Sequence, residues 1–218
     1  MSKSFWFIHS SSIESIKLSF TFYFSFIFHW IHIHQSLEIC VKGELIENRV
    51  IVWDIEDSKK LFQNGYFGKP IGIPKPKIEE IDAPLVLDLI ESLYLLENKK
   101  INISKSKNKI SIEEMIQICK LEHQDFEKKY QVYKNFRDKG YIVNPGIKFG
   151  CDFAVYEKGP GIDHAPYLVQ VYNRGETIST TGIVLAGRLA TSVKKQFILA
   201  IPKGKNEVDY LALDWWKA

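Results

Sequence analysis

Residues 41–110 combine the two-residue hydrophobic period of strands with the 3.6-residue period of helices. Residues 44–46 and 49–53 alternate on either side of a two-residue polar turn, which predicts a β-hairpin. Asp54 follows directly and has acidic residues behind it, so it predicts the N-cap of a helix that stops at Gly65. We therefore expect a hairpin followed by a helix.

A long apolar run over residues 85–97 predicts a helix that is capped by Asp82 and buried on most sides. It should be the core helix of a first domain. Residues 100–103 predict a strand. Ser111 and Glu114 then have the spacing of a capping box, which predicts another short helix through Ile118.

An aromatic stripe at helical spacing begins the second half of the chain. It predicts a helix over residues 125–139 that Gly140 ends, with its rings packed in the core. The aromatic positions are Phe126, Tyr130, Tyr133 and Phe136. Strands are predicted at 151–156, 164–172 and 196–201, and a helix at 180–193. This order predicts an α/β fold whose second domain has a mixed sheet between helices.

Residues 1–40 have a different pattern. Residues 16–34 are nearly all apolar or aromatic, and phenylalanines alternate from position 20 to position 28 as in a strand. The run approaches the length of a membrane span, but four polar residues lie in its centre. It could be sequence outside the functional protein, a membrane segment or an oligomer contact. We expect the first, with translation starting at position 41, because such an exposed run would favour aggregation.

Composition restricts the class of protein. The chain has 218 residues, 45% of them hydrophobic, which suits one large domain or two small ones. Its formal net charge of +3 is mild, so any nucleic-acid surface must be a local patch. The three cysteines and the dispersed histidines lack the spacing of a zinc site, and a scattered, odd set of cysteines is typical of a reduced intracellular protein.

Three residues of the second half could carry out acid–base chemistry together. Tyr156 ends a predicted strand, His164 begins the next one, and Lys195 directly precedes a third. Three strands and a helix can bring these side chains to one end of a sheet, although spacing alone only permits this. Each residue also has a structural alternative. Tyr156 could be a packed ring, His164 a turn residue and Lys195 a solvated partner of the helix dipole.

Two long blocks of the second half, GYIVNPGIKFGCDFAVYEKGPGIDHAPYLV and GRLATSVKK, resemble the catalytic domain of the archaeal tRNA-splicing endonucleases. Upstream, GELIENRVIVWDIEDSKKLFQNGYFGKPIG and LVLDLIESLYLLENKKINI resemble that family's N-terminal domain. The resemblance covers roughly residues 42–218. We accordingly expect a leader at 1–40 outside the functional fold, a small mixed α/β N-terminal domain at 41–122 and a restriction-endonuclease-like catalytic domain at 123–218.

The resemblance implies cleavage of RNA to a 2′,3′-cyclic phosphate and a 5′-hydroxyl without a metal or other cofactor. RNA supplies the nucleophile, its ribose 2′-hydroxyl, so the protein must supply a base, an acid and charge stabilisation. The resemblance assigns these roles to Tyr156, His164 and Lys195, respectively. Lys194 is the adjacent rival for the third role, and the order of the basic pair in the family favours Lys195.

The resemblance also implies a clamp for a flipped-out base. Arg188 lies seven residues before Lys195, about two helical turns, which would place both on one helix face. In the family an arginine here stacks on a base of the bulge, and a second planar group near the C-terminus lies on the other side. Trp215 fits that position better than Trp216, and packing of the last strand is the alternative for either.

Substrate and partners are implied in the same way. The substrate would be precursor tRNA with a bulge-helix-bulge splice site, met in the cytoplasm and not at a membrane. The blocks most resemble the catalytic subunits of heterotetramers, in which two copies act with two copies of a structural paralogue. Residues 173–179, which in the family dock acidic side chains onto a partner, hold a single acid here, Glu176.

Two alternatives are a metal-dependent nuclease and a non-catalytic structural subunit of the same enzyme. A metal-dependent nuclease on a similar sheet needs one acid and then an acid-x-Lys on the next strand. Asp152 could be the first acid, but residues 167–172 contain none. A structural subunit would be expected to lack the Tyr–His–Lys set, which this chain has.

Overall fold

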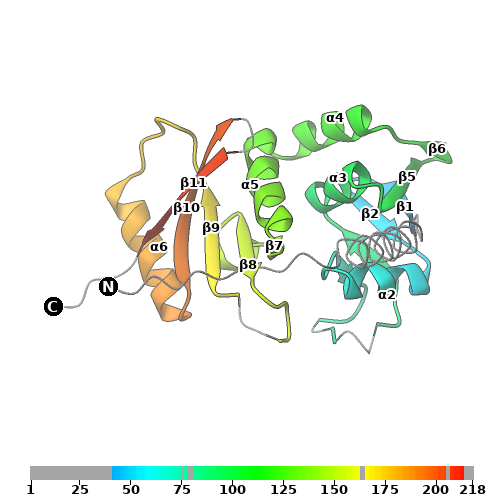
Figure 1. Cartoon of the computed structure of the whole chain (residues 1–218), viewed down its shortest axis with the longest axis horizontal. Helices are drawn as coiled ribbons and strands as arrows, with labels where there is room; N and C mark the ends of the chain where they lie inside the picture. The colour runs from blue at the N-terminus through cyan, green and yellow to red at the C-terminus, as the bar shows by residue number, and fades with distance from the viewer. Residues whose placement is uncertain (1–40, 75, 78–80, 163–164, 205–206, 214–218) are drawn as a thin grey trace, which may run out of the picture. The chain divides into compact units, whose positions relative to one another are not determined.

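Two β-sheets organise the part of the chain that the structure, a computed structural model, describes (Figure 1). The described residues are 41–74, 76–77, 81–162, 165–204 and 207–213. The predictions for the leader, for His164 and for Trp215 fall outside these ranges.

The first sheet has six strands in the order β3-β4-β2-β1-β5-β6. The strands are β1 (Val41–Ile46), β2 (Arg49–Val52), β3 (Lys69–Pro70), β4 (Leu85–Leu87), β5 (Ile101–Lys105) and β6 (Asn108–Lys109). The pairing of β1 with β5 is parallel and the other pairings are antiparallel. Strands β1 and β2 form the predicted hairpin, and alternate residues on the central strands are buried, such as Val50 and Val52.

Three helices accompany this sheet: α2 (Ile55–Gln63), α3 (Leu89–Glu97) and α4 (Ile112–Glu122). Two of their predicted caps are confirmed. The Asp54 side chain accepts a hydrogen bond of 2.9 Å from the Asp57 amide at the start of α2. At the start of α4, Ser111 and Glu114 exchange both bonds of a capping box, and the helix is one turn longer than expected.

The prediction of one helix over residues 85–97 is wrong in its first part. Leu85 and Leu87 pair with β2 as strand β4, and the helix begins only at Leu89. Asp88, not Asp82, is its N-cap, and Glu91 completes a capping box with it. The apolar run continues through both elements because strand and helix are both buried, which hides the change of period from 2 to 3.6. The prediction that α3 is a core helix is confirmed, since Leu89 to Leu96 are all buried.

The second sheet has five strands in the order β11-β10-β9-β8-β7. They are β7 (Ile142–Pro145), β8 (Phe153–Tyr156), β9 (Tyr167–Val171), β10 (Gln196–Gly204) and β11 (Glu207–Leu213). The β9–β10 pairing is parallel and the others are antiparallel, so the predicted mixed sheet is confirmed. A single 3₁₀ turn, η2 (Ile147–Phe149), joins β7 to β8.

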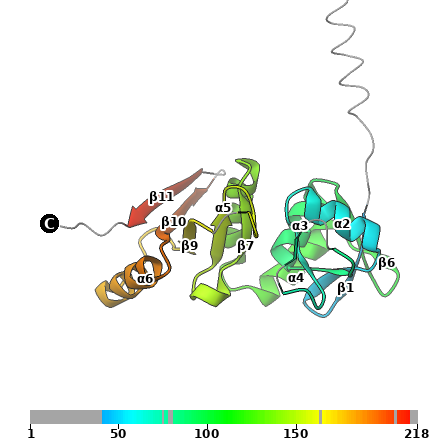
Figure 2. The same ribbon diagram turned by 90° about the horizontal axis from the view of Figure 1, so that it is seen from below.

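Helices α5 (Phe126–Asp138) and α6 (Thr180–Ser192) cover opposite faces of this sheet (Figures 1 and 2). Alternate residues of β10 show why. Ile198 and Ala200 belong to the same apolar cluster as the aromatic stripe of α5, whereas Phe197 and Leu199 cluster with Ala190 of α6. A strand buried on both faces is continuously apolar, and this is the pattern of β10. The fold class predicted from the sequence is therefore confirmed.

Arg137 of α5 connects the two halves of the described chain through a buried set of contacts. Its guanidinium donates to the carbonyl oxygen of Gly65 (2.7 Å) and to that of Val143 (3.1 Å). It also lies 3.6 Å from the Glu91 carboxylate of α3 and stacks 4.1 Å from the centre of the Phe67 ring. Side-chain exposure is 3% for Arg137 and 6% for Glu91, so the ion pair is shielded from water.

Candidate active site

At one end of the second sheet, the end of β8 lies beside the beginnings of β9 and β10. We call this row of strand ends the sheet edge. Register defines this edge, because Val155 of β8 lies opposite Tyr167 of β9, which lies opposite Gln196 of β10. The residues one step further along the three strand ends are Tyr156, Pro166 and Lys195. Strand register thus brings the ends that carry Tyr156 and Lys195 to the same edge of the sheet, as the sequence suggested.

Lys195 contacts the segment that follows His164. Its Nζ donates a hydrogen bond to the carbonyl oxygen of Ala165 and lies 5.4 Å from the centre of the Phe149 ring. Ala165 is the residue directly after His164, which itself lies outside the described residues. Lys195 therefore contacts the residue that directly follows the predicted acid in the sequence.

The end of α6 determines where Lys195 points. Lys194 has a positive φ of 56° and ends the helix in the left-handed conformation. The Lys194 amide donates to the carbonyl of Thr191 (3.1 Å) and the Lys195 amide to that of Ala190 (2.8 Å), the two bonds of a Schellman motif. This turn leaves Lys194 exposed and places Lys195 half-buried at the sheet edge.

The same turn contradicts the expected relation between Arg188 and Lys195. Helix α6 ends at Ser192, so Lys195 lies beyond it and helical periodicity does not relate the two residues. Arg188 is exposed on α6. The prediction that both lie on one helix face is wrong, because the left-handed Lys194 breaks the helix first.

Tyr156 and Tyr167 are the phenols of the two strands that meet at this edge, and their surroundings differ. The Tyr167 hydroxyl donates to a carboxylate oxygen of Glu157 at 2.9 Å, and this hydrogen bond raises the pKa of Tyr167. A phenol that is held protonated is a poor base. Tyr156 is half-buried at the end of β8 and packs its ring against the apolar clusters of the sheet. Tyr167 is therefore a poor candidate base, and the role that the resemblance assigns to Tyr156 stays a prediction.

A glycine fixes the loop between β8 and β9. Gly159 is buried with a φ of +134°, and a Cβ atom there would lie 2.5 Å from the ring of Tyr66. Glycine is therefore required both by the backbone conformation and by the close approach of the ring. Sequence reasoning missed the partners Tyr66 and Phe149. Both lie in blocks that carry the family resemblance, Tyr66 in GYFGKPIG and Phe149 in KFG.

The carboxylate of Asp152 is bonded within the fold. Its carboxylate accepts the Val171 amide at 2.8 Å and pairs with Lys129 at 2.9 Å, so it connects β8, β9 and α5. Within the described ranges, no group of three or more His, Cys, Asp and Glu side chains is arranged to hold a metal ion. The described helices also include none that is long and apolar enough to cross a membrane.

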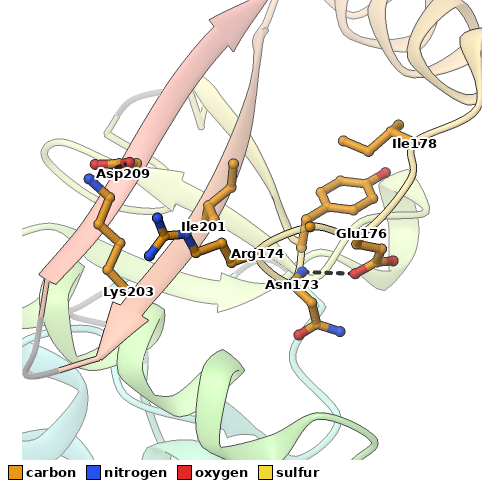
Figure 3. A pocket seen from close by; sticks show the side chains of 9 residues that line it. Asn173, Arg174, Glu176, Ile178, Ile201, Lys203 and Asp209 are labelled. Carbon is orange, nitrogen blue, oxygen red and sulfur yellow. Dashed lines mark hydrogen bonds and ion pairs between the residues drawn. The ribbon is translucent and has the colours of Figure 1, made fainter.

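The loop after β9 borders a pocket of about 320 Å³ between it and strands β10 and β11 (Figure 3). The lining residues are Tyr172, Asn173, Arg174, Gly175, Glu176, Ile178, Ile201, Lys203 and Asp209. Neither Tyr156 nor Lys195 lines it. The Glu176 carboxylate accepts the Asn173 amide at 2.8 Å, so the single acid of this loop is bonded within the loop itself.

Comparison with known families matches both halves of the chain. Residues 126–210 match the tRNA intron endonuclease, catalytic C-terminal domain, and residues 41–116 match the tRNA intron endonuclease, N-terminal domain. The chain belongs to the tRNA intron endonuclease family. The resemblance noted in the sequence is therefore confirmed, and in this family the second sheet, with Tyr156 and Lys195, belongs to the catalytic domain.

Curated relatives agree with the family assignment. The tRNA-splicing endonuclease of Hyperthermus butylicus is 44% identical over 179 residues, which are 81% of this chain and 99% of the relative. Those of Sulfurisphaera tokodaii and Pyrobaculum islandicum are 42% and 43% identical, over 80% and 81% of this chain and 98% and 100% of their own length. The chain is thus similar to archaeal splicing endonucleases over nearly their full length.

Proposed function

We propose that this chain is a catalytic subunit that excises introns from precursor tRNA. Membership of the tRNA intron endonuclease family and the names of the relatives support the activity. The observation that carries the proposal is the sheet edge where β8 ends at Tyr156 and Lys195 contacts Ala165, next to His164. A splicing endonuclease needs a base, an acid and a cation together, and these residues supply them.

The proposed reaction is a transesterification within the RNA. Tyr156 takes the proton of the ribose 2′-hydroxyl, and the 2′-oxygen forms a bond to the adjacent phosphorus. The bond from phosphorus to the 5′-oxygen breaks, and His164 gives that oxygen a proton. The products are a 2′,3′-cyclic phosphate and a 5′-hydroxyl, so the step balances without water, metal or redox chemistry.

Lys195 has two tasks in this scheme. Its ammonium stabilises the negative charge that builds up on the phosphoryl oxygens. A nearby cation also favours a phenolate over a phenol, which Tyr156 needs to act as a base. In the free protein Nζ donates to the Ala165 carbonyl, and we propose that substrate phosphate takes over this donor.

Recognition of a bulge-helix-bulge junction is assigned to Arg188 and Trp215. Arg188 is exposed on α6, where a guanidinium can stack on an unpaired base. Trp215 lies outside the described residues, so its part in the clamp rests on the resemblance. Such a junction offers unstacked bases, which planar side chains bind well.

We further propose that two copies of the chain act with two copies of a structural paralogue in the cytoplasm. The family's assembly loop uses acidic side chains, whereas the one acid of residues 173–179, Glu176, is already bonded to Asn173. A loop with so little free acidic surface supports a heterotetramer over a self-sufficient homotetramer.

Co-expression with and without a structural paralogue tests the proposal. Light scattering gives the assembly state, and cleavage of a bulge-helix-bulge RNA gives the activity. We expect the lone chain to be poorly active and the mixed assembly to cut at both junctions. A lone chain that forms an active tetramer would overturn the assembly, and absence of cleavage by either preparation would overturn the function.

A further inference from the structure

The β5–β6 hairpin and the turn that leads into it form a concentrated basic surface, which we name the basic hairpin (residues 99–109). It contains five lysines, and no acidic residue lies between positions 98 and 112. All five are exposed: Lys99, Lys100, Lys105, Lys107 and Lys109. For a chain whose net charge is only +3, this is a marked local excess.

These lysines differ from those of the helices in their partners. Lys59, Lys60 and Lys128 each pair with a carboxylate of their own helix end, at 3.1, 3.4 and 3.4 Å. Within the described part of the chain, no lysine of the basic hairpin is in an ion pair. Its positive charge is therefore not compensated locally and stays available to a polyanion.

Backbone strain gives a second, independent observation. Lys105 lies opposite Asn108, so the turn has two central residues, Ser106 and Lys107, with φ of 48° and 72°. Positive φ at both positions defines a type I′ turn, for which asparagine and glycine are strongly preferred. Lys99 has a φ of 55° at the end of α3, where glycine is again the favoured residue.

Among the described residues, seven non-glycine residues have positive φ, and three of them are lysines: Lys99, Lys107 and Lys194. Two of these three, Lys99 and Lys107, are in the basic hairpin. Lysine at a left-handed position costs stability relative to glycine, so a gain elsewhere is expected to offset it. Strain of this kind is typical of functional surfaces.

We propose that the basic hairpin is a second RNA-binding surface, which contacts the phosphate backbone of precursor tRNA outside the splice junction. This inference rests on the proposed function. The basic hairpin includes β6, the outermost strand of the first sheet, whereas the reaction is assigned to the ends of strands β8, β9 and β10 in the second sheet (Figure 1). Lysines bind phosphates as point charges without reading bases, so the surface adds affinity for any structured tRNA body and carries no sequence preference.

The test uses the active assembly of the full chain and two RNAs, a complete precursor tRNA and a minimal bulge-helix-bulge duplex. The variant is Lys105→Gln/Lys107→Gln/Lys109→Gln. The control is Lys59→Gln/Lys60→Gln/Lys128→Gln, which removes the same charge from ion-paired lysines. Affinity is measured between 50 and 200 mM salt, and cleavage under saturating single-turnover conditions.

Three lost phosphate contacts should lower the slope of log affinity against log salt by about 2 for the precursor. Between 50 and 200 mM salt, the hairpin variant should therefore lose about 15-fold less affinity for the precursor than the wild type does. We expect the control variant to keep the wild-type slope, and the hairpin variant to cut the minimal duplex at the wild-type rate. Equal slopes for the hairpin and control variants, or an equal loss on both RNAs, would overturn the proposal.

A single substitution separates RNA binding from folding. Lys107→Gly relieves the left-handed strain, so it should keep or raise the melting temperature and still weaken precursor binding. Unchanged precursor affinity in this variant would contradict RNA binding by the basic hairpin. If the variant instead loses binding to vesicles of acidic phospholipid and keeps its RNA affinity, the partner of this surface is a membrane and the proposal is wrong. If the wild type cuts neither RNA, the proposed function fails, and this outcome is distinct from equal behaviour of the two triple variants.

Discussion

Arg137 and Lys195 are the two cations on which this account depends, and their surroundings are opposite. The Arg137 guanidinium is 3% exposed and donates to Tyr133, Gly65 and Val143 while it faces Glu91. Lys195 is half-buried at a sheet edge, where its ammonium donates to a backbone carbonyl beside an aromatic ring. One cation is enclosed by the fold, and the other lies at its edge.

This difference suits Arg137 to a structural role and supports the catalytic role that we propose for Lys195. A buried guanidinium whose three nitrogens all donate to partners within the fold cannot exchange them for substrate without unfolding its surroundings. An ammonium at an edge can exchange a carbonyl for a phosphoryl oxygen at little cost, because both are acceptors of similar geometry. Substitutions that separate the two effects therefore test the comparison.

Loss of Arg137 should have the largest effect on stability. Arg137→Met removes the charge and the hydrogen bonds and leaves Glu91 buried without its partner, which should lower the free energy of unfolding by about 3–5 kcal/mol. Urea denaturation measures it. Lys128→Met is the matched control, because its pair with Asp125 at 3.4 Å is solvent-exposed and should contribute less than about 1 kcal/mol. A loss no larger than that of the control would contradict the structural role of Arg137.

Loss of Lys195 should act on the rate instead. Lys195→Ala should slow single-turnover cleavage by about 10²–10³-fold, the usual effect of removing a group that stabilises transition-state charge. Its melting temperature should stay close to that of the wild type. Lys194→Ala is the neighbouring control, since Lys194 is exposed at the end of α6, and we expect it to cleave at nearly the wild-type rate. Equal losses for the two lysines would remove the distinction that the helix end makes between them.

The buried pair also predicts a pH dependence of stability. Burial raises the pKa of the Glu91 carboxyl from its ordinary 4.5 to about 7, even though Arg137 opposes the shift. The folded protein therefore holds a proton that the unfolded chain releases. Protonation of Glu91 therefore stabilises the folded state fully below about pH 4.5, and this stabilisation is lost as the pH rises through about 7.

As the pH rises from 5.5 to 8, deprotonation of Glu91 should lower the free energy of unfolding by about 2 kcal/mol. Glu91→Gln should lack that part of the decrease, because an amide does not titrate. Urea denaturation of both proteins at the two pH values provides the comparison. Identical pH profiles would show that Glu91 does not titrate in the folded protein over this range.

A smaller effect is expected at the exposed cation of α6. Arg188→Ala should weaken cleavage of bulged RNA by about 1–3 kcal/mol, the range measured for stacking on a base. Trp215→Ala should act in the same direction. Gel-shift affinities and cleavage rates on a bulged RNA and on a continuous duplex distinguish stacking from general attraction. Wild-type kinetics in both variants would mean that the clamp is not used.

Local rules predicted most of the elements, because caps and turns depend on residues a few positions apart. Asp54, the pair Ser111 and Glu114, and Gly140 marked helix ends that the structure confirms. Local rules were insufficient where two buried elements adjoin. Residues 85–97 looked like one helix because the strand and the helix are equally apolar, and the capping box of Asp88 and Glu91 was the signal that could have separated them.

Long-range contacts were outside the reach of the sequence. Strand ends predicted the edge that holds Tyr156 and Lys195, since the register of a sheet follows from where its strands begin and end. The partners of Arg137 come from positions 65, 91 and 143, in separate segments of the chain, and no spacing rule connects them. The left-handed Lys194 was also unforeseen, because glycine is the residue that normally signals such a turn.

The central claim is that Tyr156, His164 and Lys195 cut RNA by acid–base catalysis without a metal ion. The most direct test is single-turnover cleavage of a bulge-helix-bulge RNA in EDTA, with analysis of the product ends, for the wild type and for His164→Ala and Lys195→Ala. We expect full wild-type activity in chelator, 2′,3′-cyclic phosphate and 5′-hydroxyl ends, and a loss of at least about tenfold in each variant. Loss of wild-type activity in EDTA, or full-rate cleavage by either variant, would contradict it.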